Sequence, residues 1–189
     1  MKPRVIGRFV IAATLLIGAG VAGAAGKKAA TAPTTDAGLA DAARHAIAMY
    51  PHYDIWDDIG IQVASGNVTL TGAVNQPYKK TDIERLVNTL PGVTRVQNDI
   101  RVLPLSPQDD RLRLTVARAI YGDPTLRRYA VEPLKPIHIL VENGHVTLAG
   151  VVATEMDKNI AGIRAASAGL SFGPVVNDLQ VEHPPARKS

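Results

Sequence analysis

The sequence predicts an α+β fold made of two tandem small modules, each in the order helix, strand, strand, helix, strand. In each module, a three-stranded mixed sheet is expected to pack against two helices. Residues 66–74 (GNVTLTGAV) match residues 144–152 (GHVTLAGVV), and residues 98–102 (NDIRV) match residues 177–181 (NDLQV). Because both matches keep their order at nearly the same offset, the chain is interpreted as a duplication of one module.

The first module is predicted over residues 36–104. Its first helix has an N-cap at Thr35 and ends before Pro51. Alternating apolar and polar residues then predict two strands joined by a two-residue turn at residues 65–66. Pro77 suits the first turn of a second helix, and the third strand follows it. The residues expected to face the core are Leu39, Ala43, Ile47, Tyr50, Ile59, Ile61, Val63, Val68, Leu70, Ile83, Leu86, Val87 and Leu90.

The second module, over residues 105–182, repeats these signals. Residues 106–109 (SPQD) resemble a capping box with proline at the first helical position. Asn143-Gly144 is a strong hairpin-turn signal. Compared with the first module, an insertion of about seven residues leaves the local structure of residues 121–136 open. The inner side of the second helix, capped by Thr154, is expected to carry Met156, Ile160, Ile163 and Ser167.

Residues 1–25 are expected to be a signal peptide. A basic start precedes an uncharged apolar stretch at residues 9–22, and small residues at 22–24 form a cleavage site. The protein is therefore expected in the periplasm, with residues 26–35 as a linker and 183–189 as a tail. The alternative is an uncleaved leader that anchors the protein in the inner membrane, because the apolar run approaches the length of a membrane span.

The composition excludes several functional classes. The chain has no cysteine, which removes disulfides, cysteine nucleophiles, thiolate metal sites and lipid attachment through an N-terminal cysteine. Without the three basic residues of the leader, 18 basic residues face 17 acidic ones. Neither predicted module is basic and aromatic residues are few, so no nucleic-acid partner is expected.

Histidines and carboxylates are the first candidates for chemistry. His138, Glu142 and His145 share one face of the second hairpin, but His138 and His145 lie about 13 Å apart along the ladder, too far to share a metal ion. We therefore expect a solvated polar face there. No nucleophile elbow or phosphate-binding loop is visible. The sequence predicts a protein that is not an enzyme and that has no cofactor, no metal site and no evident small-molecule substrate.

A second cluster, Asp54, Asp57 and Asp58, precedes the first strand. Calcium loops need oxygen ligands at alternate positions, and residues 55–56 interrupt that pattern. The prediction is a solvated turn, with Trp56 packed against the sheet. The repeated Asn-Asp pairs at residues 98–99 and 177–178 are interpreted as structural caps or bulges, since chemistry rarely needs two copies.

The repeated G-[NH]-V-T-L-[TA]-G strand, the helix end at residues 90–93 (LPGV) and the Asn-Asp-[IL]-x-Val strand resemble the BON domain, a small bacterial module named for osmotically induced and nodulation proteins. The resemblance implies a helix-backed sheet, an extracytoplasmic location and attachment to phospholipid surfaces or envelope proteins. It transfers no catalytic residue. The chain is similar to periplasmic, osmotically inducible members of the family, but it lacks the cysteine of the lipoprotein members.

A basic helix near the start of the second module is the best binding candidate. We expect the candidate surface to contain Arg111, Leu114, Arg118, Tyr121, Arg127 and Arg128. Exposed apolar residues between arginines are typical of contacts with anionic lipid. Alternatively, Leu114 packs inside the protein and the arginines pair with nearby carboxylates.

The function expected from this surface is binding of an anionic phospholipid surface or of envelope client proteins, in osmotic or envelope stress maintenance. The alternative is a structural adaptor that pairs with another envelope protein. The sequence leaves open the identity of the partner, the inducing condition and the oligomeric state.

Overall fold

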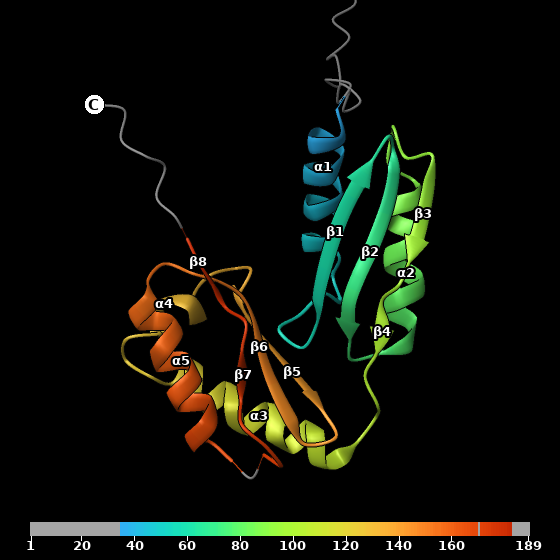
Figure 1. The fold of residues 1–189 in the computed structure, drawn as a ribbon. Helices are drawn as coiled ribbons and strands as arrows, with labels where there is room; N and C mark the ends of the chain where they lie inside the picture. The colour runs from blue at the N-terminus through green and yellow to red at the C-terminus, as the bar shows by residue number, and fades with distance from the viewer. Residues whose placement is uncertain (1–34, 170, 183–189) are drawn as a thin grey trace, which may run out of the picture. The chain divides into compact units, whose positions relative to one another are not determined.

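The computed structural model describes residues 35–169 and 171–182. The predicted signal peptide and tail lie outside the described residues, as does nearly all of the linker. Two α+β modules follow one another along the chain, each with its own sheet and apolar core (Figure 1). The predicted fold class and element order are confirmed.

The first module contains two helices on one sheet. Its elements are α1 (Asp36–Ala48), β1 (Asp58–Ala64), β2 (Asn67–Val74), α2 (Pro77–Asn88), β3 (Arg95–Asn98) and β4 (Arg101–Val102). Strand β1 pairs antiparallel with β2, and both β3 and β4 pair parallel with β2. The central strand is therefore β2, and β1 lies at one edge of the sheet (Figure 1).

The second module repeats this topology with one added short helix. Its elements are α3 (Pro107–Tyr121), α4 (Arg127–Ala130), β5 (Ile137–Glu142), β6 (His145–Val152), α5 (Glu155–Ser167), β7 (Val176–Asn177) and β8 (Gln180–Val181). Strand β6 is central, with β5 antiparallel on one side and β7 and β8 parallel on the other. Helix α4 belongs to the inserted segment whose structure the sequence left open.

Both hairpins turn as predicted. Ser65 and Gly66 have φ values of 50° and 76°, and Asn143 and Gly144 have values of 51° and 78°. Two consecutive left-handed residues define a type I′ turn, which matches the twist of the flanking strands. This turn sets the register that places Val68 and Leu70, and their counterparts in β6, on the buried face.

The third strand of each module is interrupted at the repeated Asn-Asp pair. In the first module, Asn98 donates from its side chain to the Lys80 carbonyl on α2 and accepts from the Ile100 N–H. The Asp99 N–H rejoins the ladder at the Leu70 carbonyl. Asn177 makes the same side-chain contacts with Lys158 and Leu179, and the Asp178 N–H donates to the Leu148 carbonyl. The side chain thus replaces backbone pairing at a bulge, as predicted.

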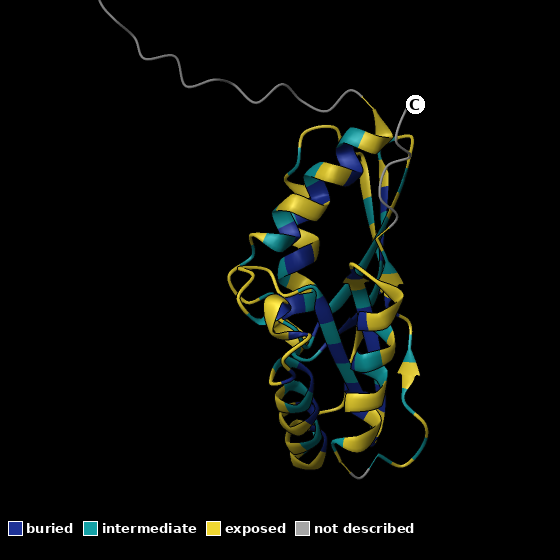
Figure 2. Cartoon of the chain, turned by 90° about the vertical axis from the view of Figure 1, so that its left-hand side faces the viewer, coloured by how far each residue is buried: buried dark blue, intermediate teal, exposed yellow. Residues whose placement is uncertain are grey.

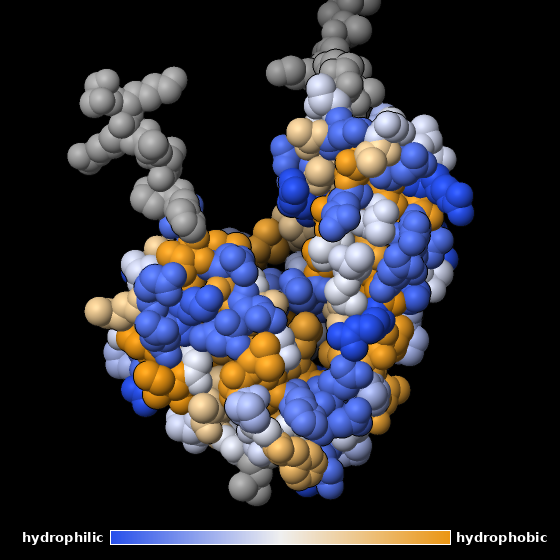
Figure 3. Space-filling view, viewed as in Figure 1, coloured by the Kyte–Doolittle hydropathy of each residue, from blue (hydrophilic) through white to orange (hydrophobic). Residues whose placement is uncertain are grey.

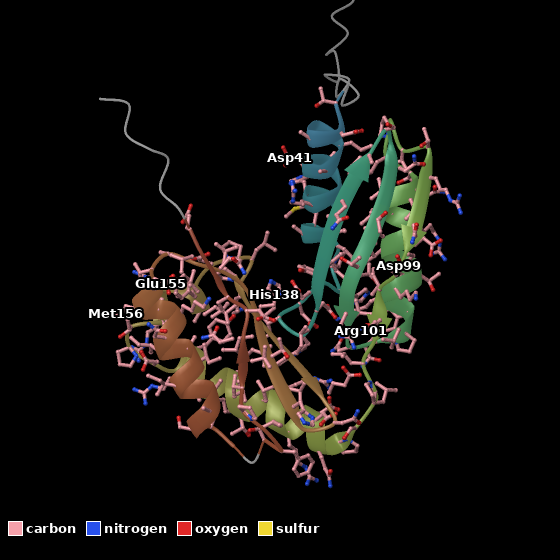
Figure 4. The ribbon with its side chains drawn as sticks, in the orientation of Figure 1. Asp41, Asp99, Arg101, His138, Glu155 and Met156 are labelled. Atoms are coloured by element: carbon pink, nitrogen blue, oxygen red, sulfur yellow. The ribbon has the colours of Figure 1, made fainter. Side chains whose placement is uncertain are left out.

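The apolar cores lie between helices and sheets, where Figure 2 shows the buried helix faces. Leu70 and Leu148 are both fully buried, at equivalent positions. The predicted stripe on α5 is only partly right, however, because Ile160 packs against the core but the other three members are exposed. Met156 and Ile163 are 67% and 66% exposed, and Met156 points outward in Figure 4. Helix α5 instead buries the small residues Ala161 and Ala165, so it sits closer to the sheet than a stripe of large side chains would allow.

The prediction of a solvated aspartate turn before β1 is also wrong. Asp57 is fully buried and forms an ion pair with Lys79 of α2, which the sequence analysis did not single out. Asp54 contacts the same ammonium from a more exposed position. Trp56 packs against the core of the second module. The spacing of Asp57 and Lys79 in the sequence, 22 residues, gave no local signal of this pair.

Candidate functional site

Helix α3 carries most of the candidate surface, and its N-terminus is fixed by two polar contacts. The Ser106 hydroxyl accepts a hydrogen bond from the Asp109 N–H, as expected of an N-cap. The Asp109 carboxylate does not return to Ser106 as in a capping box. It accepts from the N–H groups of Asn143 and Gly144 at 3.0 Å and 2.8 Å, across 34 and 35 residues of sequence. The helix is thereby tied to the hairpin turn.

Two further side chains of α3 reach the outer edge of β5. Arg113, which is 3% exposed, donates to the Val141 carbonyl at 2.7 Å. The Tyr121 hydroxyl donates to the Ile137 carbonyl at 2.6 Å. Burial raises the pKa of the Tyr121 phenol, so the hydroxyl remains a donor at any physiological pH. The prediction that Tyr121 joins Leu114 on the exposed side is therefore wrong: its ring packs against the core.

The exposed side of α3 presents Arg111, Leu114 and Arg118. At 100° per residue these positions span about 60° of the helix surface. All three are exposed, Leu114 to 48%. Among the described residues, neither arginine forms an ion pair. Asp110, the carboxylate that directly precedes Arg111 in the sequence, pairs with Arg113 instead.

The other two candidate arginines lie in α4. Arg127 is exposed and has no ion pair among the described residues. Arg128 pairs with the buried carboxylate of Asp157 and lies over the Tyr129 ring, 4.9 Å from its centroid. Arg128 therefore has an internal structural contact, while half of its side chain remains accessible.

A groove adjoins the N-terminal half of α3 and includes Arg111 in its wall. It has a volume of about 550 Å³. Its apolar part comes from Leu112 and from Phe172, whose ring packs against the backbone of Gly144. The remaining wall residues are Ser106, Gln108, Asp109, Thr115, Asn143 and Gly169. An unpaired guanidinium thus stands beside an apolar surface, an arrangement suited to an amphipathic ligand.

The polar face predicted on the second hairpin is partly occupied by protein contacts. His138 is half-buried beside the Tyr53 ring, at 5.6 Å between centroids, and Glu142 pairs with Arg101 at 2.9 Å. His138 is therefore not solvated as predicted, because Tyr53 of the loop between α1 and β1 lies against it. Within residues 35–169 and 171–182, no group of three potential metal ligands is found.

The geometry defines a duplicated small α+β module in which polar side chains fix the helices and one helix exposes a basic face. The BON domain model matches residues 35–104 and 108–182, so the chain belongs to the BON domain family. BON-domain proteins are typically periplasmic or envelope-associated and generally non-enzymatic, and the domains are known for lipid or protein interaction. In the described part of the chain, no helix is both long and apolar enough to span a membrane.

No curated protein matches the chain. Two solved structures of CdsD, a structural protein of the type III secretion system of Chlamydia trachomatis, are similar at 16% identity, each with a TM-score of 0.30. The aligned regions cover 74% and 76% of this chain. They span 59% and 64% of the CdsD chains, less than two thirds of either.

Proposed function

We propose that this protein is an exported envelope protein that binds anionic phospholipid surfaces through the basic face of α3, in envelope or osmotic stress maintenance. The observation that carries the proposal is the row Arg111, Leu114 and Arg118. Two guanidinium groups, neither with a carboxylate partner in the described part of the chain, lie on either side of an exposed leucine along the helix. Unpaired arginines near a surface favour anionic lipid by about 1 kcal/mol each, and the leucine adds an apolar contact.

Family membership supports the same class of function, because BON domains are known for lipid or protein interaction. Arg127 extends the positive charge beyond α3, and no carboxylate of residues 35–169 or 171–182 pairs with it. Tyr121 adds nothing to this contact, because its ring packs against the core. The proposed contact surface is therefore Arg111, Leu114, Arg118 and Arg127, with Arg128 at its margin.

Vesicle co-sedimentation tests the proposal. The protein should bind vesicles of phosphatidylglycerol and phosphatidylcholine, and should ignore vesicles of phosphatidylcholine alone. Binding should fall as salt rises, since exposed charges are screened over about 10 Å at 0.1 M. The double variant Arg111→Gln with Arg118→Gln should bind about tenfold or more weakly, because two contacts of about 1 kcal/mol are lost.

The matched control is Arg44→Gln with Arg95→Gln, which removes the same charge from exposed positions of the first module. This control should bind like the parent. Equal binding by the double α3 variant, or no binding by the parent, would contradict the lipid proposal. The adaptor function would then take its place, with retention of an envelope protein partner in detergent as its signature.

A further inference from the structure

The outer edge of β1 is open. In a two-residue hairpin the closing pair, here Ala64 and Asn67, is hydrogen-bonded, and bonded and non-bonded pairs then alternate. The N–H and C=O groups of Ile59, Ile61 and Val63 therefore point away from β2. Among the strands that the structure describes, β2 alone pairs with β1. In Figure 1 it is the outermost strand of its sheet.

The equivalent edge in the second module is not open. Strand β5 has the same register, so Ile137, Ile139 and Val141 point their backbone groups outward. Three contacts meet these groups: the Tyr121 hydroxyl at the Ile137 carbonyl, Arg113 at the Val141 carbonyl, and the Ile55 carbonyl at the Ile139 N–H. The β5 edge is thus covered by two side chains of the first helix and by the backbone of the turn before β1, which meet three of its six outward groups.

The first helix of module one cannot close its edge in this way. Helices α1 and α3 bury the same pattern at an offset of 73 residues: Ala40, Ala43 and Ile47 against Arg113, Val116 and Ile120. In this alignment Ala40 stands where α3 has Arg113, and Ala48 stands where it has Tyr121. A methyl group neither reaches the strand edge nor donates a hydrogen bond.

The edges of β1 and β5 accordingly differ in burial and in hydrogen bonding. Ile61 and Val63 are half-buried, while Ile139 and Val141 are fully buried. Within the described residues, the outward backbone groups of Ile61 and Val63 have no partner. Only the Ile59 N–H is approached, by the phenol oxygen of Tyr53.

The open edge also carries none of the features that prevent strand addition. From Ile59 to Ala64 the strand has no charged residue and no proline, and its ladder with β2 has no bulge. Natural edge strands usually use at least one of these features against pairing. Ile59, Ile61 and Val63 project toward the core, so an added strand would extend the apolar layer.

We propose that β1 pairs antiparallel with β1 of a second copy of this chain. The register that pairs all three outward residues is centred on Ile61, where Ile61 meets Ile61 and Ile59 meets Val63 of the other copy. Each such pair exchanges two hydrogen bonds. On the opposite face, Gln62 meets Gly60, which offers no steric obstacle. The contact is isologous, as a two-fold axis requires.

A contact of five residues on each side is small compared with a standard stable interface, so the dimer is weak. Sedimentation equilibrium of the purified protein should show a monomer at low concentration and a rising dimer fraction up to about 1 mM. Over the same range, hydrogen exchange of the Ile61 and Val63 amides should slow. A monomer at every concentration would overturn the proposal and leave only heterologous strands as occupants.

Equivalent proline variants provide the decisive comparison. Val63→Pro removes an outward N–H that the first module does not use, and two hydrogen bonds of the symmetric pair are lost with it. Val141→Pro makes the same change at the equivalent position of β5 and should leave association unchanged. We expect Val63→Pro to abolish the dimer. Dimerisation of Val63→Pro at the parent's level would contradict the register proposed.

A second variant adds the missing side chains. Ala40→Arg with Ala48→Tyr copies the closure seen on β5 and should give a monomer whose melting temperature shows that it is folded. Lipid binding through α3 is expected to be unchanged in this variant, so failure of either proposal is recognisable without the other. Persistent dimerisation of a folded Ala40→Arg/Ala48→Tyr variant would count against the edge as the site.

Discussion

Lys79 and Asp57 form an ion pair in the interior of the first module, with 2.7 Å between Nζ and Oδ2 and both side chains at 2% exposure or less. Asp54 accepts from the same ammonium at 3.0 Å, and the other oxygen of Asp57 accepts from the Asn75 N–H. These contacts connect the segment before β1 to the start of α2. A buried charge without its partner is costly, so the pair is sensitive to single substitutions.

Lys79→Met should destabilise the protein by about 3–5 kcal/mol, because Asp57 would keep a buried charge without a cation. Urea unfolding followed by circular dichroism measures the change. Lys80 forms no ion pair with any described residue, so the neighbouring substitution Lys80→Met should change stability by less than about 0.5 kcal/mol. Adding Asp57→Asn to Lys79→Met should recover part of the loss. Full stability in the single Lys79 variant would show that the pair contributes nothing.

The two aspartates that accept hydrogen bonds from the hairpin turns should contribute differently to the free energy of unfolding. Asp36 accepts from the N–H groups of Ser65 and Gly66, as Asp109 does from those of Asn143 and Gly144. Asp109 is buried, whereas Asp36 is exposed and competes with water. We expect Asp109→Ala to cost about 2–3 kcal/mol and Asp36→Ala about 1 kcal/mol. Equal thermal shifts for both would contradict the role of burial.

Stability should depend on pH through Asp123. Burial alone would raise the pKa of this carboxyl, but hydrogen bonds from the Thr125 N–H and from Arg164, with the charge of Arg164, hold it below its ordinary value. As pH falls, Asp123 is protonated in the unfolded chain before it is protonated in the folded protein. The stabilisation that the ionised carboxylate provides is therefore present above about pH 4 and is lost below it. Arg164→Gln should flatten the decline of the urea midpoint below about pH 4. If the urea midpoint of the variant declined with pH as steeply as that of the parent, the Asp123–Arg164 pair would be excluded as the source of the decline.

The stability of each module should depend on the buried leucine of its own central strand. Leu70 and Leu148 are fully buried at matching places in β2 and β6. Leu70→Ala and Leu148→Ala should each cost about 2–5 kcal/mol, the range for emptying a buried leucine site. Thermal or urea unfolding of the two variants checks this. A melting temperature like the parent's in either variant would mean that the strand is displaced by one residue.

The elements set by local signals were predictable from the sequence. The turns at residues 65–66 and 143–144 and the cap at Thr154 need only neighbouring residues, and all three form as expected. The Asn-Asp interruptions were recognisable because they recur. Helix α5 was assigned a partly wrong buried side because it has more apolar residues than that side can accommodate. Ala161 and Ala165 face the core since small residues allow close approach, and hydrophobicity alone does not report that.

Contacts between distant residues were not predictable in this way. Arg113 was not singled out from the sequence and Asp109 was expected in a capping box, yet both are buried by bonds to β5 and its turn. Tyr121 was placed outside by helical geometry, and its hydroxyl instead needs the carbonyl of Ile137, 16 residues away. In hindsight, comparing the two first helices offers a signal: arginine and tyrosine occur in one copy where the other has alanine.

The interruption of the third strand at Asn98 and Asn177 bears on aggregation. On the side opposite β1 and β5, each sheet ends in pieces of only two to four residues, separated by a bulge. Such an edge offers no continuous template for cross-β growth. Because the edge of β5 is covered, β1 is the one long edge available in the described part of the chain. Antiparallel self-pairing occupies this edge in both copies. Association through this fold therefore stops at a closed pair and does not continue into fibres.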